Sequence, residues 1–197
     1  MTAADASLIE ALTGALPERS VIADPDAMSA YRWDRANDPN AGMPLAVVRV
    51  TSTEEVQTVV RLAAAAHVAI VPRGAGSGLS GGSTAIDGCI VLSLDRMRDI
   101  TVDPITRTVV AQPGAFNAEV KAAAHEHGLW YPPDPASFQF CSIGGNVATN
   151  AGGLCCVKYG VTTDYVLGMT VVLADGRAVK LGGPKIKDVA GYSLTKH

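Results

Sequence analysis

The stretch "RGAGSGLSGG", residues 73–82, directly follows the apolar run "HVAIVP" and contains the spacing G-x-G-x-x-G. In a dinucleotide-binding turn, that spacing leaves a strand and opens a helix whose N-terminus faces a pyrophosphate. The preceding residues do predict a strand, but "GGSTAIDGCIVLSL" has no helical period and predicts another strand. A Walker loop is excluded too, because no Gly-Lys-Ser/Thr follows. Neither familiar phosphate motif explains this stretch.

A second glycine-rich segment, "SIGGNVATNAGG", spans residues 142–153 and is expected to be another loop, and the two segments hold nine of the chain's 20 glycines. A flexible linker is an alternative, but the first segment lies between two apolar strands. Glycine allows a backbone to approach a ligand closely, and successive N–H groups form an anion nest. Arg73 could add a fixed positive charge for a phosphate. Residue types leave two interpretations open, which are phosphate binding and structural turns.

The surrounding sequence predicts the elements that position these segments. Helices are expected over residues 6–16, 24–34, 51–67 and 116–128, and strands over residues 45–50, 68–72, 89–94, 99–103 and 108–113. Ser52 and Glu55 predict a capping box, and Gly128 a helix C-terminus. Asp24 with Pro25 predicts a helix start, and Asp175-Gly176 in residues 165–181 the turn of a hairpin. Residues 45–72 form a strand-helix-strand unit, but strict alternation then stops, which favours an α+β fold.

Composition narrows the class of protein. With 197 residues, 48% hydrophobic and 18% charged, the chain suits one globular domain or two small ones. The net charge is −3 with no basic stripe, so we expect no nucleic-acid partner. No apolar run is long enough for a membrane span, and the start lacks secretory-signal features. Four cysteines without a C-x-x-C pair predict reduced, packing thiols in a cytoplasmic protein: Cys89, Cys141, Cys155 and Cys156.

Several motifs together resemble one family, the FAD-linked oxidases of the vanillyl-alcohol oxidase/PCMH type. Within it, the chain is most similar to the branch that holds glycolate oxidase and D-lactate dehydrogenase. The matching segments run in family order from about residue 44 to the last residue: "VPRGAGSGLSGG", "VAQPGAFNAEV", "YPPDPAS", "CSIGGNVATNAGG", "CVKYGVTTDYVLGMTVVLADG" and "KDVAGYSLTK". The resemblance implies a PCMH-type FAD-binding domain of two small α+β subdomains, incomplete at the C-terminus, over residues 44–197. Residues 1–43 are then a helical lead-in.

The resemblance also implies the cofactor contacts. The first loop is expected to wrap the FAD pyrophosphate with its amides, and the second segment to lie along the flavin and its ribityl chain. Each position also has a plain structural reading, such as turn geometry or close packing. The implied cofactor-binding residues are Arg73, Gly74, Ala75, Gly76, Ser77, Gly78, Ser80, Gly81, Gln112, Pro113, Gly114, Pro133, Asp134, Ser137, Ser142, Ile143, Gly144, Gly145, Asn146, Thr149, Asn150, Gly152, Gly153, Tyr159, Gly160 and Val189.

Other titratable residues give weaker signals. Ser77 stands where covalent members of the superfamily often have a histidine, so we expect non-covalent FAD, with Cys141 packing beside the loop. His125 and His127 are two apart on a predicted helix and point to different faces, so no metal site is expected. Tyr31 and Asp34 could face the flavin edge, but packing is the preferred interpretation. Lys158 is expected either to neutralise a phosphate or reduced flavin, or to be solvated.

The resemblance implies hydride transfer from a D-2-hydroxy acid, such as glycolate or D-lactate, to FAD, with room for an electron-accepting partner. Relatives are longer and complete the site with a substrate-binding cap domain, so we expect a truncated chain that is inactive alone, and its catalytic residues stay unassigned. One alternative is a non-catalytic flavin- or nucleotide-binding module that works with a partner. Another is a different enzyme of the same fold, such as an ether-lipid synthase or a sugar-nucleotide reductase.

Overall fold

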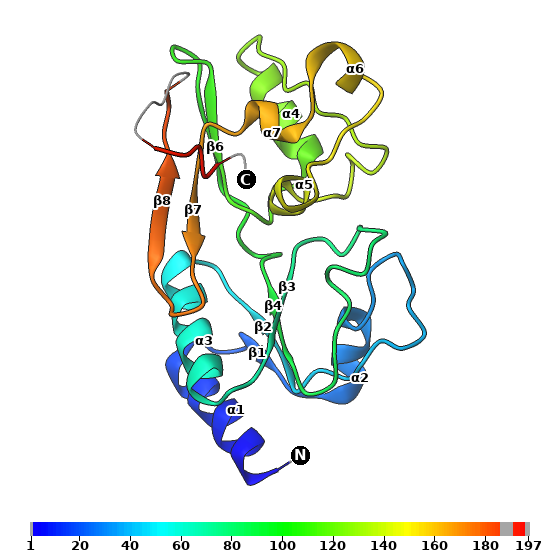
Figure 1. Ribbon diagram of the computed structural model, residues 1–197, viewed down its shortest axis with the longest axis vertical. Coiled ribbons are helices and arrows are strands. Elements are labelled where there is room, and N and C mark those ends of the chain that lie inside the picture. The colour runs from blue at the N-terminus through cyan, green and yellow to red at the C-terminus, as the bar shows by residue number, and fades with distance from the viewer. Residues whose placement is uncertain (1, 186–190, 196–197) are drawn as a thin grey trace. The chain divides into compact units, whose positions relative to one another are not determined.

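The computed structural model describes residues 2–185 and 191–195, which form two compact units (Figure 1). The first unit comprises Met1–Met97 and Val172–Arg177, and the second comprises Arg98–Val171 and Ala178–His197. Each unit has its own secondary structure. The predicted division between a lead-in of residues 1–43 and a domain of residues 44–197 stays a prediction.

The first unit is built on a four-stranded sheet in the order β1-β2-β4-β3. Its strands are β1 (Val21–Ile22), β2 (Ala46–Arg49), β3 (Ile70–Arg73) and β4 (Ile90–Ser93). β2 and β3 both run parallel to β4, which lies between them, and β1 pairs antiparallel with β2. The predicted strand-helix-strand unit is therefore present, with a later strand inserted at its centre.

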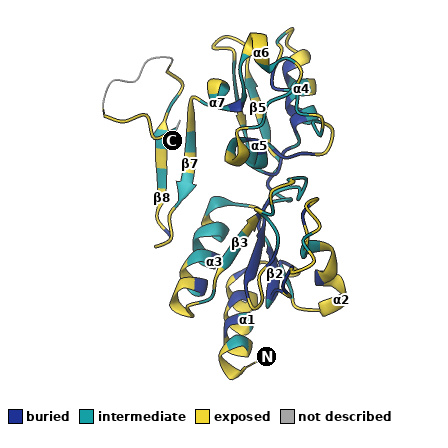
Figure 2. Cartoon of the chain, turned by 45° about the vertical axis from the view of Figure 1, so that its right-hand side comes forward, coloured by how far each residue is buried: buried dark blue, intermediate teal, exposed yellow. Residues whose placement is uncertain are grey.

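Helices cover both faces of this sheet, which explains why its central strands are apolar except at their last residues, Arg49 and Ser93. On one face, Val48 and Ile90 share a core cluster with Leu12 of α1 (Ala3–Ala15) and Val59 of α3 (Thr53–Ala65). On the other face, a second cluster forms beside α2 (Pro25–Met28) and the 3-10 turn η1 (Ser29–Tyr31), and includes Met28, Val47 and Val91. Figure 2 shows the two central strands as the most buried part of this unit.

The predicted helix starts are largely confirmed. Asp24 caps α2, with Pro25 at its first position, and accepts from the N–H groups of Asp26 and Ala27. Ser52 caps α3 by accepting from the N–H of Glu55. The expected capping box differs in one respect, because the Glu55 carboxylate reaches one residue further and binds Thr51.

The second unit contains an antiparallel pair, β5 (Ile100–Asp103) and β6 (Thr108–Ala111), which packs against α4 (Asn117–His125). Short helices follow: α5 (Ile143–Thr149), α6 (Cys156–Tyr159) and α7 (Thr162–Tyr165). The last strands are β7 (Gly168–Val172) and β8 (Ala178–Gly182), which form the predicted hairpin. Gly128 has φ 68°, as its predicted place after α4 requires.

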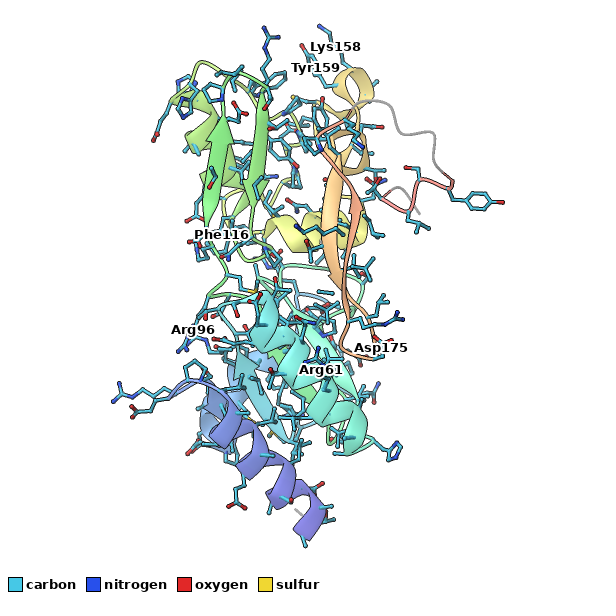
Figure 3. All side chains as sticks on the ribbon, turned by 90° about the vertical axis from the view of Figure 1, so that its left-hand side faces the viewer. Arg61, Arg96, Phe116, Lys158, Tyr159 and Asp175 are labelled. Atoms are coloured by element: carbon cyan, nitrogen blue, oxygen red, sulfur yellow. The ribbon has the colours of Figure 1, made fainter. Side chains whose placement is uncertain are left out.

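The tip of the β7–β8 hairpin, Val172–Arg177, belongs to the first unit. Gln57 and Arg61 of α3 both donate to the carbonyl of Gly176, at 2.7 and 3.0 Å. Gly176 has φ 80°, which suits glycine at this turn. In Figure 3, Arg61 lies directly beside the tip that carries Asp175.

The α+β prediction is confirmed by this mixture of helices and small sheets. One local expectation is wrong, because residues 143–149 of the second glycine-rich segment form α5 rather than a loop. Among the described residues, no helix has both the length and the apolar character to cross a membrane.

Candidate functional site

The first glycine-rich loop leaves β3 and has no regular secondary structure over residues 74–82. Gly76 and Gly81 have φ of 65° and 78°, a region that L side chains rarely adopt. The carbonyl of Gly81 accepts from the N–H of Thr84 at 3.0 Å, which closes the loop with a turn. Within residues 2–185 and 191–195, the N–H groups of Gly76, Ser77 and Gly78 donate no hydrogen bond. A run of unpaired N–H groups is what an anion nest needs.

Arg73, at the start of this loop, is only 9% exposed. Its Nη1 donates to the carbonyl of Trp33 at 2.8 Å and to that of Ser83 at 3.4 Å, and its guanidinium lies 5.8 Å from the centre of the Tyr31 ring. Burial lowers the pKa of Arg73, while the nearby Asp34 charge opposes that shift. The side chain thus holds a positive charge under the loop while bonding main-chain carbonyls.

Asp34 lies beside the same loop and is 4% exposed, so the preference for packing over a flavin-edge position agrees with its burial. Its Oδ1 accepts from the N–H of Ala36 at 2.9 Å and from Thr84 Oγ1 at 3.3 Å. Its Oδ2 is buried and has no hydrogen-bond partner in the described part of the chain. A Cβ placed on Gly78 would lie 3.8 Å from this oxygen. A buried carboxylate oxygen without a partner is rare enough to need a reason.

In the second unit, the predicted residues of "QPG" and of the second segment meet. The N–H of Gly144 donates to the carbonyl of Pro113 at 2.8 Å, and a Cβ on Gly144 would lie only 2.7 Å from Pro113 Cβ. Gln112 bonds Asp99 through its side chain and its N–H, and Gly114 is buried. These residues come together through internal packing of this unit.

The first turn of α5 uses its N–H groups within the protein. Ile143 donates to the carbonyl of Ala115, and Gly145 to the side chain of its N-cap, Ser142. The N–H of Asn146 donates to the carbonyl of the same serine. With Gly144 bonded to Pro113, this helix start has no free donors to offer a phosphate.

A buried amide cluster lies behind α5. Asn117 Nδ2 donates to Asn146 Oδ1 at 3.0 Å and to the carbonyl of Pro133 at 3.2 Å. Asn146 Nδ2 in turn donates to Cys141 Sγ at 3.2 Å, so the thiol packs beside the segment as expected. The side chain of Asn146 therefore serves the fold. Sequence reasoning missed Asn117, whose only signal was a polar residue at an inward position of the helix 116–128.

The remaining predicted residues of the second unit line the 133–160 region. Asp134 Oδ1 accepts from the N–H of Cys155 at 3.0 Å, which lowers the pKa of that carboxyl, and a Cβ on Gly153 would run into the Asp134 carbonyl. The Asn150 side chain accepts from the N–H of Thr163, and the Tyr159 ring stands edge-on to Trp130 at 4.8 Å. The further positions are Ser137, whose carbonyl accepts from Phe140 and Cys141; Thr149, bonded to the carbonyl of Gly145; Gly152, close to Val161 and Cys156; and Gly160, with φ 89°.

Three further predicted positions remain. Ser80 is exposed in the first loop, and Ala75 is half-buried there. Val189 lies outside the described residues. Lys158, for which two roles were open, is exposed at the end of α6, where it and Tyr159 are labelled in Figure 3, with its Nζ 5.0 Å from the Tyr159 ring centre.

Within the described ranges, no three His, Cys, Asp or Glu side chains gather as ligands, and all four cysteines are free thiols. Burial raises the pKa of the Tyr131 hydroxyl to about 12. At neutral pH it is a neutral hydroxyl and not a base.

Comparison with known proteins identifies the family. The family model described as "FAD binding domain" matches residues 44–182. The chain belongs to this FAD-binding family. The FAD-binding domain is 42% identical over 167 residues to glycolate oxidase subunit GlcD of Bacillus subtilis, covering 84% of this chain and 35% of that protein. It is also 40% identical over 188 residues to D-lactate dehydrogenase of Anaerostipes hadrus, covering 95% of this chain and 39% of that protein. The chain thus spans well under half the length of these relatives.

Solved structures agree on the fold of this FAD-binding domain. An alkyldihydroxyacetonephosphate synthase matches with a TM-score of 0.83 at 24% identity, covering 96% of this chain and 36% of that one. The grass pollen allergen Phl p 4 matches with a TM-score of 0.76 at 24% identity, covering 88% and 37%. At this identity the likeness concerns the PCMH-type fold alone.

Proposed function

We propose that this chain is the FAD-binding part of a flavin-dependent D-2-hydroxy acid dehydrogenase of the glycolate or D-lactate type. The proposal is supported by the family match and by relatives named glycolate oxidase subunit GlcD, D-lactate dehydrogenase and D-2-hydroxyglutarate dehydrogenase. When bound, FAD supplies the hydride acceptor for oxidation of the hydroxyl-bearing carbon. An electron-accepting partner and a cytoplasmic location belong to the same proposal, the latter in keeping with four free thiols.

The observation that carries the proposal is the set of unpaired N–H groups at Gly76, Ser77 and Gly78 within the described residues, with Arg73 buried at the start of the loop. Such a loop fits a doubly charged pyrophosphate, because several N–H donors and a nearby positive charge share the anion. We assign the pyrophosphate to residues 74–81. Because Ser77 has no side chain able to bond the flavin ring by the histidine route, the FAD is bound non-covalently in this proposal.

The second unit is assigned the flavin and ribityl contacts. Its amides at the start of α5 are already bonded, so contact would use exposed or half-buried groups such as Thr149, Gly152 and Tyr159. Asn146, Gln112 and Asp134 would act by holding these groups in place, since their side chains bond inside the unit.

A titration tests the proposal. The purified chain, freed of flavin, is titrated with FAD while flavin fluorescence and the visible spectrum are followed. We expect saturable binding, with release of free FAD on acid denaturation because the bond is non-covalent. A colourless protein that takes up no FAD would contradict the proposal.

Substrate chemistry is tested separately on the FAD-loaded chain. D-lactate, glycolate and D-2-hydroxyglutarate are added without oxygen, and L-lactate and L-2-hydroxyglutarate serve as controls. The readout is loss of the oxidised flavin's visible absorbance, at about 450 nm. Bleaching by a D-2-hydroxy acid supports a site complete in this chain. If FAD binds but is bleached only after a partner protein is added, the alternative of a non-catalytic flavin module is favoured.

A further inference from the structure

Two buried charged side chains, Asp34 and Arg73, lie under the first glycine-rich loop and are not explained by the fold alone. Both belong to the first unit, and both are at least nine-tenths buried. Burial of a charge is unfavourable unless it is compensated. No direct ion pair joins them in the described residues, but the Asp34 charge opposes the loss of the Arg73 proton. The two charges therefore stabilise each other electrostatically, while their hydrogen bonds are made to other groups.

Their hydrogen bonds go instead to residues that border the loop, and the main chain beside Asp34 bonds its middle. Arg73 stands at the first end and donates to the carbonyl of Ser83 at the other end, and it also reaches the carbonyl of Trp33. Asp34 accepts from Thr84 Oγ1, immediately after the loop. In the middle, the carbonyl of Gly78 accepts from the N–H of Arg35 at 3.0 Å. The segment 33–35 and the Arg73 side chain thus fix the loop at three points.

The loop backbone also lies directly against the guanidinium. A Cβ added to Gly76 would run into Nη2 of Arg73, and Gly76 has φ 65°. Gly76 is therefore pressed against Arg73 on one side, while its own N–H and those of the next two residues have no partner in the described part of the chain. The carbonyls of Gly78 and Gly81 are bonded by the N–H groups of Arg35 and Thr84, so the loop is held through its carbonyls while these amides stay available to a ligand.

We propose that Asp34 and Arg73 are positioning residues that hold the loop of residues 74–82 in the shape that binds the FAD pyrophosphate. This inference rests on the proposed function and deepens it. Neither side chain needs to touch the cofactor, because each acts through the carbonyls and the hydroxyl to which it is bonded. A loop fixed before binding loses less conformational freedom when FAD arrives, and this raises affinity.

The first experiment compares FAD affinity among variants of the chain. We expect Arg73→Gln to raise the Kd for FAD at least about tenfold, and Arg73→Lys to recover little, because lysine lacks the planar guanidinium against which Gly76 lies. Arg32→Gln is the matched control: Arg32 is also partly buried and bonds two main-chain carbonyls, those of Ala41 and Gly42, away from residues 74–82. It should lower thermal stability without changing FAD affinity.

The outcome for Arg73→Lys separates positioning from direct contact. If Arg73 binds phosphate as a point charge, the lysine variant keeps the wild-type affinity and the wild-type salt dependence, and the proposal is overturned. Thr84→Val provides a milder change if Arg73→Gln does not fold, because it removes only the bond to Asp34 Oδ1. We expect it to raise the Kd roughly threefold. Wild-type affinity in Thr84→Val would likewise overturn the proposal.

A readout without FAD completes the test. Amide hydrogen exchange is measured in the flavin-free chain at Arg35 and Thr84, whose N–H groups bond the loop carbonyls of Gly78 and Gly81, and we expect it to become faster in Arg73→Gln and Thr84→Val but not in Arg32→Gln. Unchanged exchange in both variants contradicts positioning. This distinguishes the two proposals. A wild-type chain in which these amides exchange slowly but which fails to bind FAD would contradict the proposed function, and it would still support the positioning role of Asp34 and Arg73.

Discussion

The two glycine-rich segments have similar compositions and opposite constructions. Residues 74–82 stay irregular, with the carbonyls of Gly78 and Gly81 bonded to main-chain N–H groups and several amides without a partner in the described residues. Residues 142–153 begin with α5, whose first N–H groups are all bonded inside the second unit. Glycine allows positive φ at Gly76 and Gly81 in the first segment, and close backbone packing at Gly144 and Gly153 in the second. A high glycine content alone does not tell these roles apart.

The largest effect is expected at Gly153. A Cβ there runs into the carbonyl of Asp134, which is backbone and cannot easily yield. We expect Gly153→Ala to lower the free energy of unfolding by about 3 kcal/mol. Gly82→Ala is the control in the first loop, because its Cβ meets nothing within 4 Å in the described structure, and it should change stability by less than about 1 kcal/mol. Urea denaturation followed by circular dichroism measures both free energies of unfolding. Equal decreases in the two variants would contradict the proposed difference between the two glycine-rich segments.

Asn146 tests whether the second segment depends on its internal bonds. Asn146→Ala removes the acceptor of Asn117 Nδ2 and the donor to Cys141 Sγ in a buried site. We expect a loss of about 2 kcal/mol in unfolding free energy, since buried polar groups lose a partner. FAD affinity, measured at a temperature where the variant is fully folded, should fall less than threefold or so. A large loss of affinity in a fully stable variant would instead indicate direct contact with the cofactor.

Acid should lower the free energy of unfolding through protonation of Asp134, which lies against Gly153 of the second segment. Its folded pKa is lowered, first by the hydrogen bond from the Cys155 N–H, so the ionised form stabilises the folded state. This contribution is fully present above the unfolded pKa of the carboxyl and is lost as the pH falls through the lower, folded pKa. Urea midpoints measured from about pH 6 down to about pH 2.5 should show a decrease that is smaller in Asp134→Asn. If the urea midpoint falls equally with pH in the wild type and in Asp134→Asn, Asp134 does not cause the loss of stability in acid.

The smallest effect on stability is expected at Gly78. Its Cβ would make only an ordinary contact with Asp34 Oδ2, and its φ lies outside the region that favours glycine. We expect Gly78→Ala to change the unfolding free energy by less than about 0.5 kcal/mol. FAD affinity should nevertheless fall several-fold, about 1 kcal/mol, because the new methyl group narrows the approach to the loop. Gly144→Ala should show the reverse, with lower stability because its Cβ would press on Pro113.

Local pattern sufficed for most elements. The apolar period of α3, the cap at Ser52 and the turn at Asp175-Gly176 all predict what the structure contains. The glycines of residues 142–153 misled the prediction, because helix propensity disfavours glycine, while α5 is stabilised by its N-cap and by packing on Pro113. Tertiary contacts outweighed propensity there.

The sequence predicts where the candidate site lies along the chain, but it does not predict the hydrogen-bond partners of the polar side chains in it. Sequence placed Arg73 at the loop, yet its bonds run to Trp33 and Ser83, 40 residues before it and ten after. Likewise, nothing local shows that Asn146 points toward Asn117. Such directions depend on contacts between segments far apart in the chain, which spacing and composition do not report.

The support of the first loop from residues 33–35 has a practical consequence for protein production. The family match begins at residue 44, so a protein trimmed to that boundary would lack Trp33, Asp34 and Arg35, and with them three of the loop's anchors. It would also lack β1, leaving β2 as an open sheet edge and the side of the core that α1 covers bare. Open edges and bare apolar faces promote aggregation. Trimming to the family boundary is therefore expected to yield insoluble material, whatever the flavin supply.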